Sequence, residues 1–292
     1  MTTRTLSPSA VRAGANSAIP YVIAVLLAFV VSGVLIAMLG HDPFAAFQAI
    51  LTSSFKSSFG FVETVQKWVP LVLLALGFTI PLAAGKYNIG GEGQLLVGAT
   101  AAAGVGIVPM VALLPAILIG PVLFDQDGMV YFAFLLSGAL YWLLYRTNLG
   151  LKVRSVGENP KAADSLGINV SRIRIVTATV GASLMALAGA YLPMVYTGTY
   201  TEGIVSGRGW LAIALAFFGG WRPQYILAGA TFFAGMEVLA LRVQVAGVAV
   251  PHQFVSMLPY IATLLVMMFA MHWARIPAFL GRNYDRESRT AH

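Results

Sequence analysis

The sequence of 292 residues contains no cysteine and very little charge. Only 10% of its residues are Asp, Glu, Lys or Arg, whereas soluble chains carry about 25%. Because so few charged side chains cannot cover a globular surface in water, the composition excludes a soluble enzyme and a disordered tail. The absence of cysteine excludes thiol chemistry and a secreted disulfide scaffold.

Motifs for nucleotide, metal or nucleophilic chemistry are also missing. The phosphate-binding pattern Gly-x4-Gly-Lys-Ser/Thr does not occur, and no Gly-x-Ser-x-Gly arrangement stands out. His41, His252 and His272 stand near the ends of apolar stretches, without a second ligand at metal-binding spacing. We therefore expect no catalytic residue, no metal and no cofactor bound by this chain.

What the sequence does contain is long stretches without charge. Since about 20 apolar residues cross a bilayer as a helix, these stretches predict an all-α, polytopic membrane protein with about 8 transmembrane helices. Residues 1–292 are expected to form a single transmembrane domain. The stretch around 209–220 is short and is expected to be tilted, broken or re-entrant. The expected spans are 19–40, 69–85, 94–114, 129–145, 174–197, 209–220, 224–241 and 253–273.

The positions of Lys and Arg predict the orientation in the membrane. Basic residues mark cytoplasmic segments, so we expect a cytoplasmic N-terminal tail (1–18), a cytoplasmic loop (146–174) and a cytoplasmic C-terminal tail (275–292). Lys67 and Arg208 are then expected outside or near the outer face, and 44–67 forms an interfacial or periplasmic segment. The net charge of +7 therefore reflects topology, and we expect no nucleic-acid partner.

Within the basic loop, one short segment has the pattern of a capped helix. Asn159 suits an N-cap and Pro160 the first helical position, while Gly167 can end the helix in the left-handed conformation. The expected helix, 160–166, has about two turns and is marginal alone in water. It is either ordered by a partner surface or part of a solvated basic loop, and spacing alone favours neither.

Two further segments place carboxylates at membrane depth, where an ionisable residue usually serves a function. Residues 86–94 join two spans and combine three glycines with polar side chains. Glu92 there faces either a cavity or partner, or the lipid headgroups. Glu237 lies in an otherwise apolar helix with Arg242 five residues later, which indicates either a structural ion pair or a role in transport.

The loop also carries a recognisable pattern: Arg146-Thr-x-Leu-Gly-Leu-x-x-Arg-x-Val-Gly-Glu-Asn-Pro-x-Ala-Ala-Asp-x-x-Gly-Ile168. It resembles the coupling loop of ABC-importer permeases for branched-chain amino acids, simple sugars and nucleosides. The resemblance covers most of the chain from about 68 onward and is greatest to the sugar/nucleoside branch. This chain is shorter than the family between about 105 and 118. Further similar motifs lie at 88–94, 207–223, 239–244 and 251–260.

The resemblance implies a permease subunit in a bacterial cytoplasmic (inner) membrane. It implies an ATPase subunit that binds ATP and Mg²⁺, a second permease subunit, the same or different, and a periplasmic or lipoprotein substrate-binding protein. The solute would be a nucleoside or simple sugar. The residues assigned to ATPase coupling are Gly157, Glu158, Asn159, Pro160, Ala162, Ala163 and Gly167. Those assigned to the translocation path are Asn88, Glu92, Gln94 and Glu237.

Other functions remain open at this stage. An ion-driven secondary transporter would work without an ATPase, and an importer permease for branched-chain amino acids would differ only in its solute. An intramembrane enzyme would need a nucleophile and base, or metal ligands, inside a span, and the sequence offers none.

Overall fold

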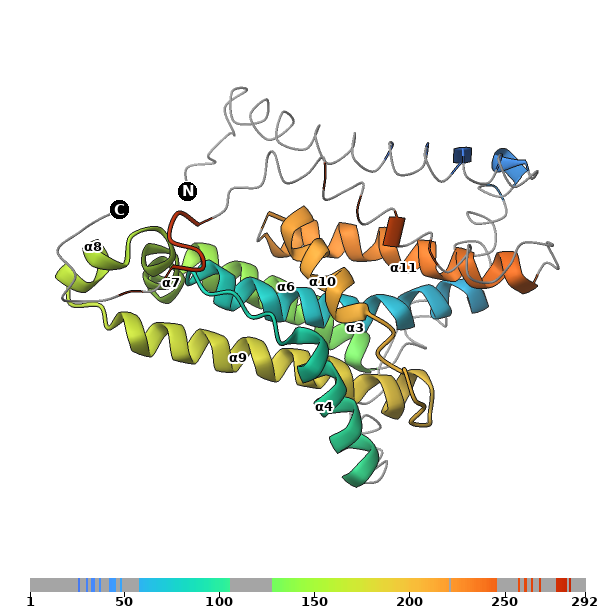
Figure 1. Ribbon diagram of the computed structural model, residues 1–292, viewed down its shortest axis with the longest axis horizontal. Helices are drawn as coiled ribbons and strands as arrows, with labels where there is room; N and C mark the ends of the chain where they lie inside the picture. Colours follow the sequence, from blue (N-terminus) through green and yellow to red (C-terminus); the bar gives the residue numbers. More distant parts are fainter. Residues whose placement is uncertain are drawn as a thin grey trace, which may run out of the picture.

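The computed structural model describes residues 58–105, 128–220, 222–245 and 277–282, together with Tyr284 and single positions within 26–48 and 257–268. All elements within these ranges are helices (Figure 1). The expected spans 19–40 and 253–273, the N-terminal tail and the end of the span at 94–114 lie outside the continuous described ranges. An all-helical membrane protein is confirmed, while the number of spans and their orientation stay predictions.

Three described helices are long and apolar enough to cross a membrane: Val62–Ala83, Gly128–Arg146 and Val170–Tyr196. They correspond to α3 (Ser58–Ala83), to α6 (Gly128–Arg146), and to α9 (Val170–Tyr191) with a π-helical turn at Leu192–Tyr196. Helix α11 (Pro223–Val245) packs beside α3 (Figure 1). The prediction for 44–67 was wrong over 62–67, because this part belongs to the candidate span Val62–Ala83 and its Thr64 and Lys67 are buried.

Helix α3 is the centre of the bundle. Its side chains from Val69 to Leu76 are almost completely buried, and it contacts α9, α11, α10 (Arg208–Phe218) and α6. Glycines allow the backbones to approach: an added Cβ at Gly77 would overlap α9 at Gly181, and one at Gly181 would overlap α3. Such close backbone contact is the usual way in which helices associate in lipid.

Helix α10 is too short to cross the membrane alone. It has 11 residues, which corresponds to about 16 Å against about 30 Å of hydrocarbon. Residues 197–207 lead into α10 through turns, so the expectation of a short or broken element at 209–220 is confirmed. Helix α4 is described over Gly91–Val105, and residues 86–88 lead into it without helical structure.

The basic loop is helical rather than irregular. Thr147 caps α7 (Asn148–Glu158), Asn159 caps α8 (Pro160–Ser165), and Asn169 caps α9, each through its side-chain oxygen. The Asn159 cap, Pro160 in the first turn and the left-handed Gly167 (φ +79°) confirm the predicted short helix. Helix α7 was not expected, since its polar sequence was interpreted as loop.

The described part of the C-terminal tail packs against this end of the bundle. The N–H of Phe279 donates to the carbonyl of Gly157 at 3.0 Å, and the N–H of Gly281 donates to that of Gly85 at 3.2 Å. Pro277 is buried. The tail therefore joins α7 to the residues that follow α3, instead of extending freely.

Candidate functional site

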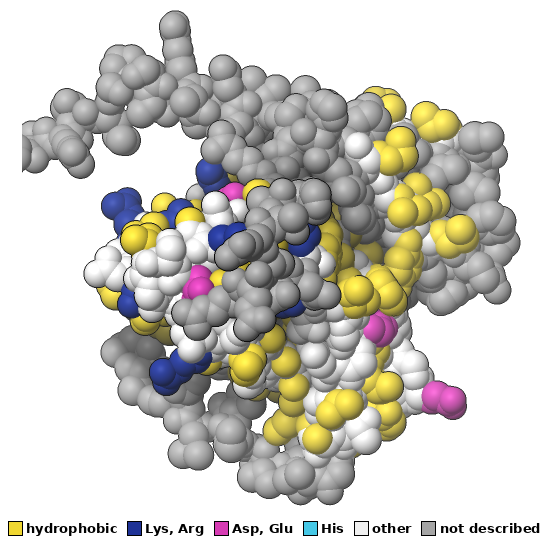
Figure 2. Space-filling model, turned by 60° about the vertical axis from the view of Figure 1, so that its left-hand side comes forward, with side chains coloured by type: hydrophobic (Ala, Val, Ile, Leu, Met, Phe, Trp, Pro, Cys, Tyr) yellow, Lys and Arg dark blue, Asp and Glu magenta, His cyan; other side chains and the backbone are white. Residues whose placement is uncertain are grey.

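The first candidate site is the end of the molecule formed by α7 and α8. All six basic residues of the predicted loop lie here, at the end of α6, along α7 and α8 and at the start of α9. Figure 2 shows Lys and Arg side chains gathered towards this end of the molecule. The end is therefore a positively charged, largely polar surface at the edge of an apolar bundle.

The predicted coupling residues divide into two groups by exposure. Gly157, Pro160 and Ala163 are buried within the chain, and an added Cβ at Gly157 would overlap the carbonyl of Ala83. These three residues therefore fasten the helices to the bundle and have no surface for a partner. The exposed members are Glu158, Asn159, Ala162 and Gly167.

Leu166, which the sequence analysis did not select, is the most prominent apolar side chain of this end. It caps the C-terminus of α8 and is 80% exposed. Its neighbour Gly167 has open space around it.

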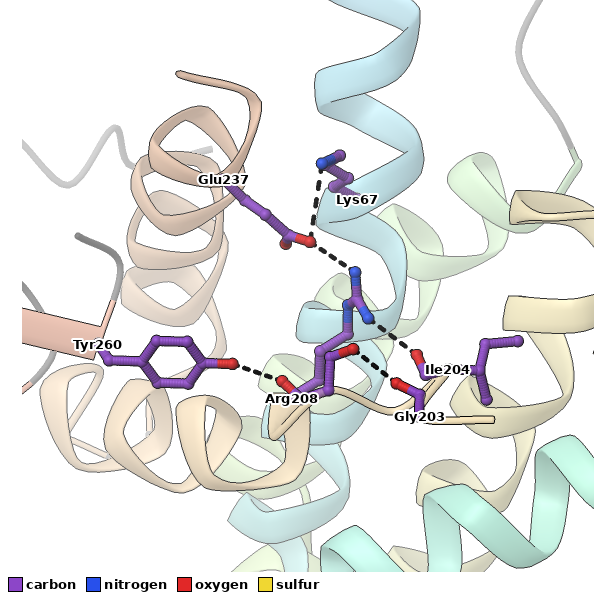
Figure 3. A network of polar contacts seen from close by, with 7 residues as sticks. Lys67, Gly203, Ile204, Arg208, Glu237 and Tyr260 are labelled. Atoms are coloured by element: carbon purple, nitrogen blue, oxygen red, sulfur yellow. Dashed lines mark hydrogen bonds and ion pairs between the residues drawn. The ribbon is translucent and has the colours of Figure 1, made fainter. Parts of the chain in front are cut away.

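Charged residues of the described bundle interior meet at a second site, where α3, α10 and α11 come together (Figure 3). The guanidinium of Arg208 donates to Oε1 of Glu237 at 2.5 Å, and Nζ of Lys67 lies 3.7 Å from the same oxygen. Lys67 is 2% exposed and Arg208 is 7% exposed. Both side chains are buried beside the carboxylate of Glu237, a contact that topology rules do not consider, while their position relative to the outer face stays a prediction.

Glu237 has ion-pair partners on two other helices, Arg208 from α10 and Lys67 from α3. The side chain of Arg242 lies outside the described part, so the predicted pair with Arg242 stays a prediction. A partly buried carboxylate is stable when paired with cations, and the two cations here come from two other elements. Glu237 therefore joins three helices.

Glu92 lies on the other side of the same segment. One carboxylate oxygen accepts a 3.0 Å hydrogen bond from the N–H of Gly207, and the other accepts a 2.6 Å bond from that of Gly209. These groups belong to the N-terminus of α10, where N–H groups lack partners within the helix. Glu92 is itself in the first turn of α4, so its charge faces the positive ends of two helix dipoles.

Asn88 and Gln94 hold the start of α4 rather than contacting α10. Their side-chain amides exchange hydrogen bonds of 3.1 and 3.2 Å, and Asn88 also accepts from the N–H of Gly90. An Asn88 amide nitrogen lies 3.6 Å from the sulfur of Met185 in α9. The structure thus brings Glu92 and Glu237 to one segment, residues 203–209, and places Asn88 and Gln94 beside it as supports of α4.

Comparison with known proteins identifies relatives of this sequence. A family profile described as "Branched-chain amino acid transport system / permease component" matches residues 120–271. The chain is 33% identical over 193 residues to TsgC13 of Haloferax volcanii, provisionally named a glucose ABC transporter permease; the match takes in 58% of this chain and 59% of that protein. No solved structure matches the chain.

Two further relatives show how the lengths compare. NupC of Lactococcus lactis, a nucleoside ABC transporter permease, is 32% identical over 180 residues, with 61% of this chain and 56% of NupC covered. The glucose ABC transporter permease TsgB13 of Haloferax volcanii is 26% identical over 306 residues, with 77% of this chain and 80% of TsgB13 covered. This alignment is longer than the chain itself, so TsgB13 carries internal residues that the chain lacks. The chain spans little more than half of TsgC13 and NupC.

Proposed function

The chain belongs to the family of permease components of branched-chain amino acid transport systems, and on that premise we propose that it is a permease subunit of an ABC importer. The printed names of its relatives, for glucose and nucleoside transport, support a simple sugar or a nucleoside as the solute. The observation that carries the proposal is the α7–α8 end, where a short capped helix presents exposed residues beside an apolar bundle.

The α7–α8 end is the proposed docking site for an ATPase subunit, which would supply ATP hydrolysis with Mg²⁺. Glu158, Asn159, Ala162 and Gly167 are exposed there and would contact the partner, together with Leu166. Gly157, Pro160 and Ala163 would act indirectly, since Gly157 holds α7 against α3 and Ala163 packs α8 against Val156 of α7 and Val170 of α9. This end would face the cytoplasm, in agreement with its basic residues.

The bundle around α3, α4, α10 and α11 would form half of the translocation path, with Glu92 and Glu237 at its polar centre. A second permease subunit would supply the other half. TsgB13 and TsgC13 come from one organism and both match this chain, which supports a pair of different subunits. A substrate-binding protein would deliver the solute to the outer face of the cytoplasmic membrane.

The docking proposal is tested by co-purification with an ATPase subunit encoded beside this chain. A Pro160→Gly, Lys161→Glu double variant should retain less ATPase than the wild type, because it loosens α8 and reverses one of its charges. The matched pair Leu166→Ala and Leu135→Ala separates docking from general exposure, since both leucines are exposed but Leu135 lies in α6, outside the α7–α8 end. Equal ATPase recovery with all variants would refute the docking site.

A further inference from the structure

Residues 203–207 form turns rather than a helix and lead into Arg208 and Gly209 at the start of α10. Ile204, Val205, Arg208 and Gly209 are buried, while Gly203 and Ser206 are exposed. Glu237 is 14 residues beyond Pro223, and Lys67 is 16 residues from Ala83, which corresponds to about 21 and 24 Å along their helices. Ala83 lies against Gly157 of α7, and Arg222 lies beside Tyr145 at the end of α6. Both distances are therefore counted from the same end, and they place the Arg208 ion pair in the far third of a hydrocarbon layer of about 30 Å.

The backbone of this turn is strained as well as irregular. Gly203 and Gly207 have φ angles of +77° and +72°, and Ser206, which has a side chain, has a φ of +46°. A non-glycine residue at positive φ is unfavourable and persists only where surrounding contacts impose it. Irregular backbone at membrane depth is tolerated where protein surrounds it or where it lines a water-filled path.

Contacts from four separate parts of the chain impose this conformation. Glu92 of α4 binds the N–H groups of Gly207 and Gly209. Glu237 of α11 binds Arg208, with Lys67 of α3 on the same oxygen. The hydroxyl of Tyr260 donates to the carbonyl of Ser206 at 2.5 Å (Figure 3). An added Cβ at Gly209 would overlap Glu92, so this close fit requires glycine.

These contacts can be broken and replaced only together. Moving Arg208 away from Glu237 leaves buried charges without a partner, and moving α10 away from Glu92 leaves its first N–H groups unsatisfied. Both changes are costly. Partial displacement is therefore unfavourable, and a turn held in this way changes between discrete arrangements, as switching elements do.

We propose that residues 203–209 are a gate in the translocation path, and that Glu92 and Glu237 are positioning residues that hold it in the arrangement seen here. This inference rests on the proposed transport function and adds the moving part. Binding of ATP by the partner would bias the gate towards a second arrangement, in which the turn leaves Glu92, Glu237 or both.

The absence of cysteine makes the gate directly testable. In the complex with its ATPase, Ser206→Cys reports the turn, Leu166→Cys reports docking, and Glu202→Cys is a matched control. Glu202 and Ser206 are both exposed in the same connection, but only Ser206 lies within the turn. The measurement is the rate of maleimide labelling without nucleotide and with ATP and vanadate.

We expect ATP and vanadate to lower the rate at Ser206→Cys by about tenfold or more, because the arrangement in which Ser206 is exposed falls to a population of about 0.1–10%. The rate at Glu202→Cys should stay constant. If the ATPase protects Leu166→Cys from maleimide and the rate at Ser206→Cys does not change, the gate alone is overturned. If the ATPase does not protect Leu166→Cys from maleimide, ATPase docking is overturned, and the gate with it. If Ser206→Cys does not fold, Tyr260→Cys serves as the reporter, with the same expected change and the same refuting result.

Discussion

Glu92 and Gly209 are 117 positions apart in the sequence, yet a hydrogen bond of 2.6 Å joins the Glu92 carboxylate to the Gly209 N–H. This bond connects the first turns of two helices, α4 and α10, inside the bundle. Because the positive ends of both helix dipoles converge on one carboxylate, Glu92 stabilises the two helix starts together. Its loss should affect both helices.

Glu92→Gln should lower the free energy of unfolding in detergent by about 1–2 kcal/mol, since the amide keeps one acceptor and turns its NH₂ group towards an N–H. The measurement is denaturant unfolding followed by tryptophan fluorescence. Glu202→Gln removes the same charge from an exposed position and should change little. Equal stability of the two variants would contradict the role of Glu92 as a cap.

Glu237→Gln should lower the free energy of unfolding by more, about 3–5 kcal/mol, because it leaves the buried Lys67 and Arg208 without the Glu237 carboxylate. Adding Lys67→Met to this variant should recover part of the loss, since one unpaired cation is removed. The double-mutant cycle, measured by the same unfolding assay, should give a coupling energy of about 0.5–3 kcal/mol. Strictly additive effects would show that Lys67 and Glu237 do not interact.

A third prediction concerns the contact between α4 and α9. An added Cβ at Gly189 would overlap the carbonyl of Leu95, whereas Gly138 in α6 has open space. Gly189→Ala should therefore destabilise the protein by about 1–3 kcal/mol through overpacking. Gly138→Ala should stabilise it by about 0.5–1 kcal/mol through its better helix propensity. Thermal unfolding of the two variants should shift in opposite directions, and parallel shifts would refute the packing of α4 on α9.

Lys86 gives a prediction about pH. Partial burial, and then the positive charge of Arg174, lower the pKa of Lys86 below its ordinary value of 10.5. The folded state therefore disfavours the charged form, so the unfolded chain binds more protons between the two pKa values and stability rises with pH there. The stability gained from uncharged Lys86 is complete above pH 10.5 and is lost as the pH falls through the folded-state pKa of Lys86.

Lys86→Met should remove this dependence. The free energy of unfolding of the wild type, measured against that of Lys86→Met, should increase from pH 7 to pH values near 10.5. Arg172→Met is a suitable control, because Arg172 is an exposed cation at the same end of the molecule. Parallel pH profiles for wild type and Lys86→Met would contradict the effect.

The sequence predicted local features of this fold better than distant contacts. Asn159, Pro160 and Gly167 act through their immediate backbone, so α8 could be predicted from a few adjacent residues. The burial of Arg208 was not predicted, because its partner Glu237 is 29 positions away and counting positive charges places an arginine by topology alone. The signal that could have found it was present: Gly207 and Gly209 flank an arginine at the start of an apolar stretch.

The contacts of Glu92 could not be predicted from the sequence either. Its position among glycines near a span indicated a function, and both its interpretations concerned its surroundings rather than a helix cap. The capping role depends on where α10 begins in space, which no pattern within 86–94 contains. The exposure of Leu166 was also not predicted, because a leucine at the end of a predicted short helix is normally expected to be buried.

The central claim, that this chain is the permease subunit of an ATP-driven importer, is tested most directly by transport in reconstituted vesicles. The purified complex of this chain with its second permease subunit and ATPase should take up radiolabelled glucose or guanosine, supplied with the substrate-binding protein. Uptake should require ATP and persist when ionophores abolish ion gradients. Uptake that proceeds without the ATPase and stops with the ionophores would contradict the account and establish an ion-driven transporter.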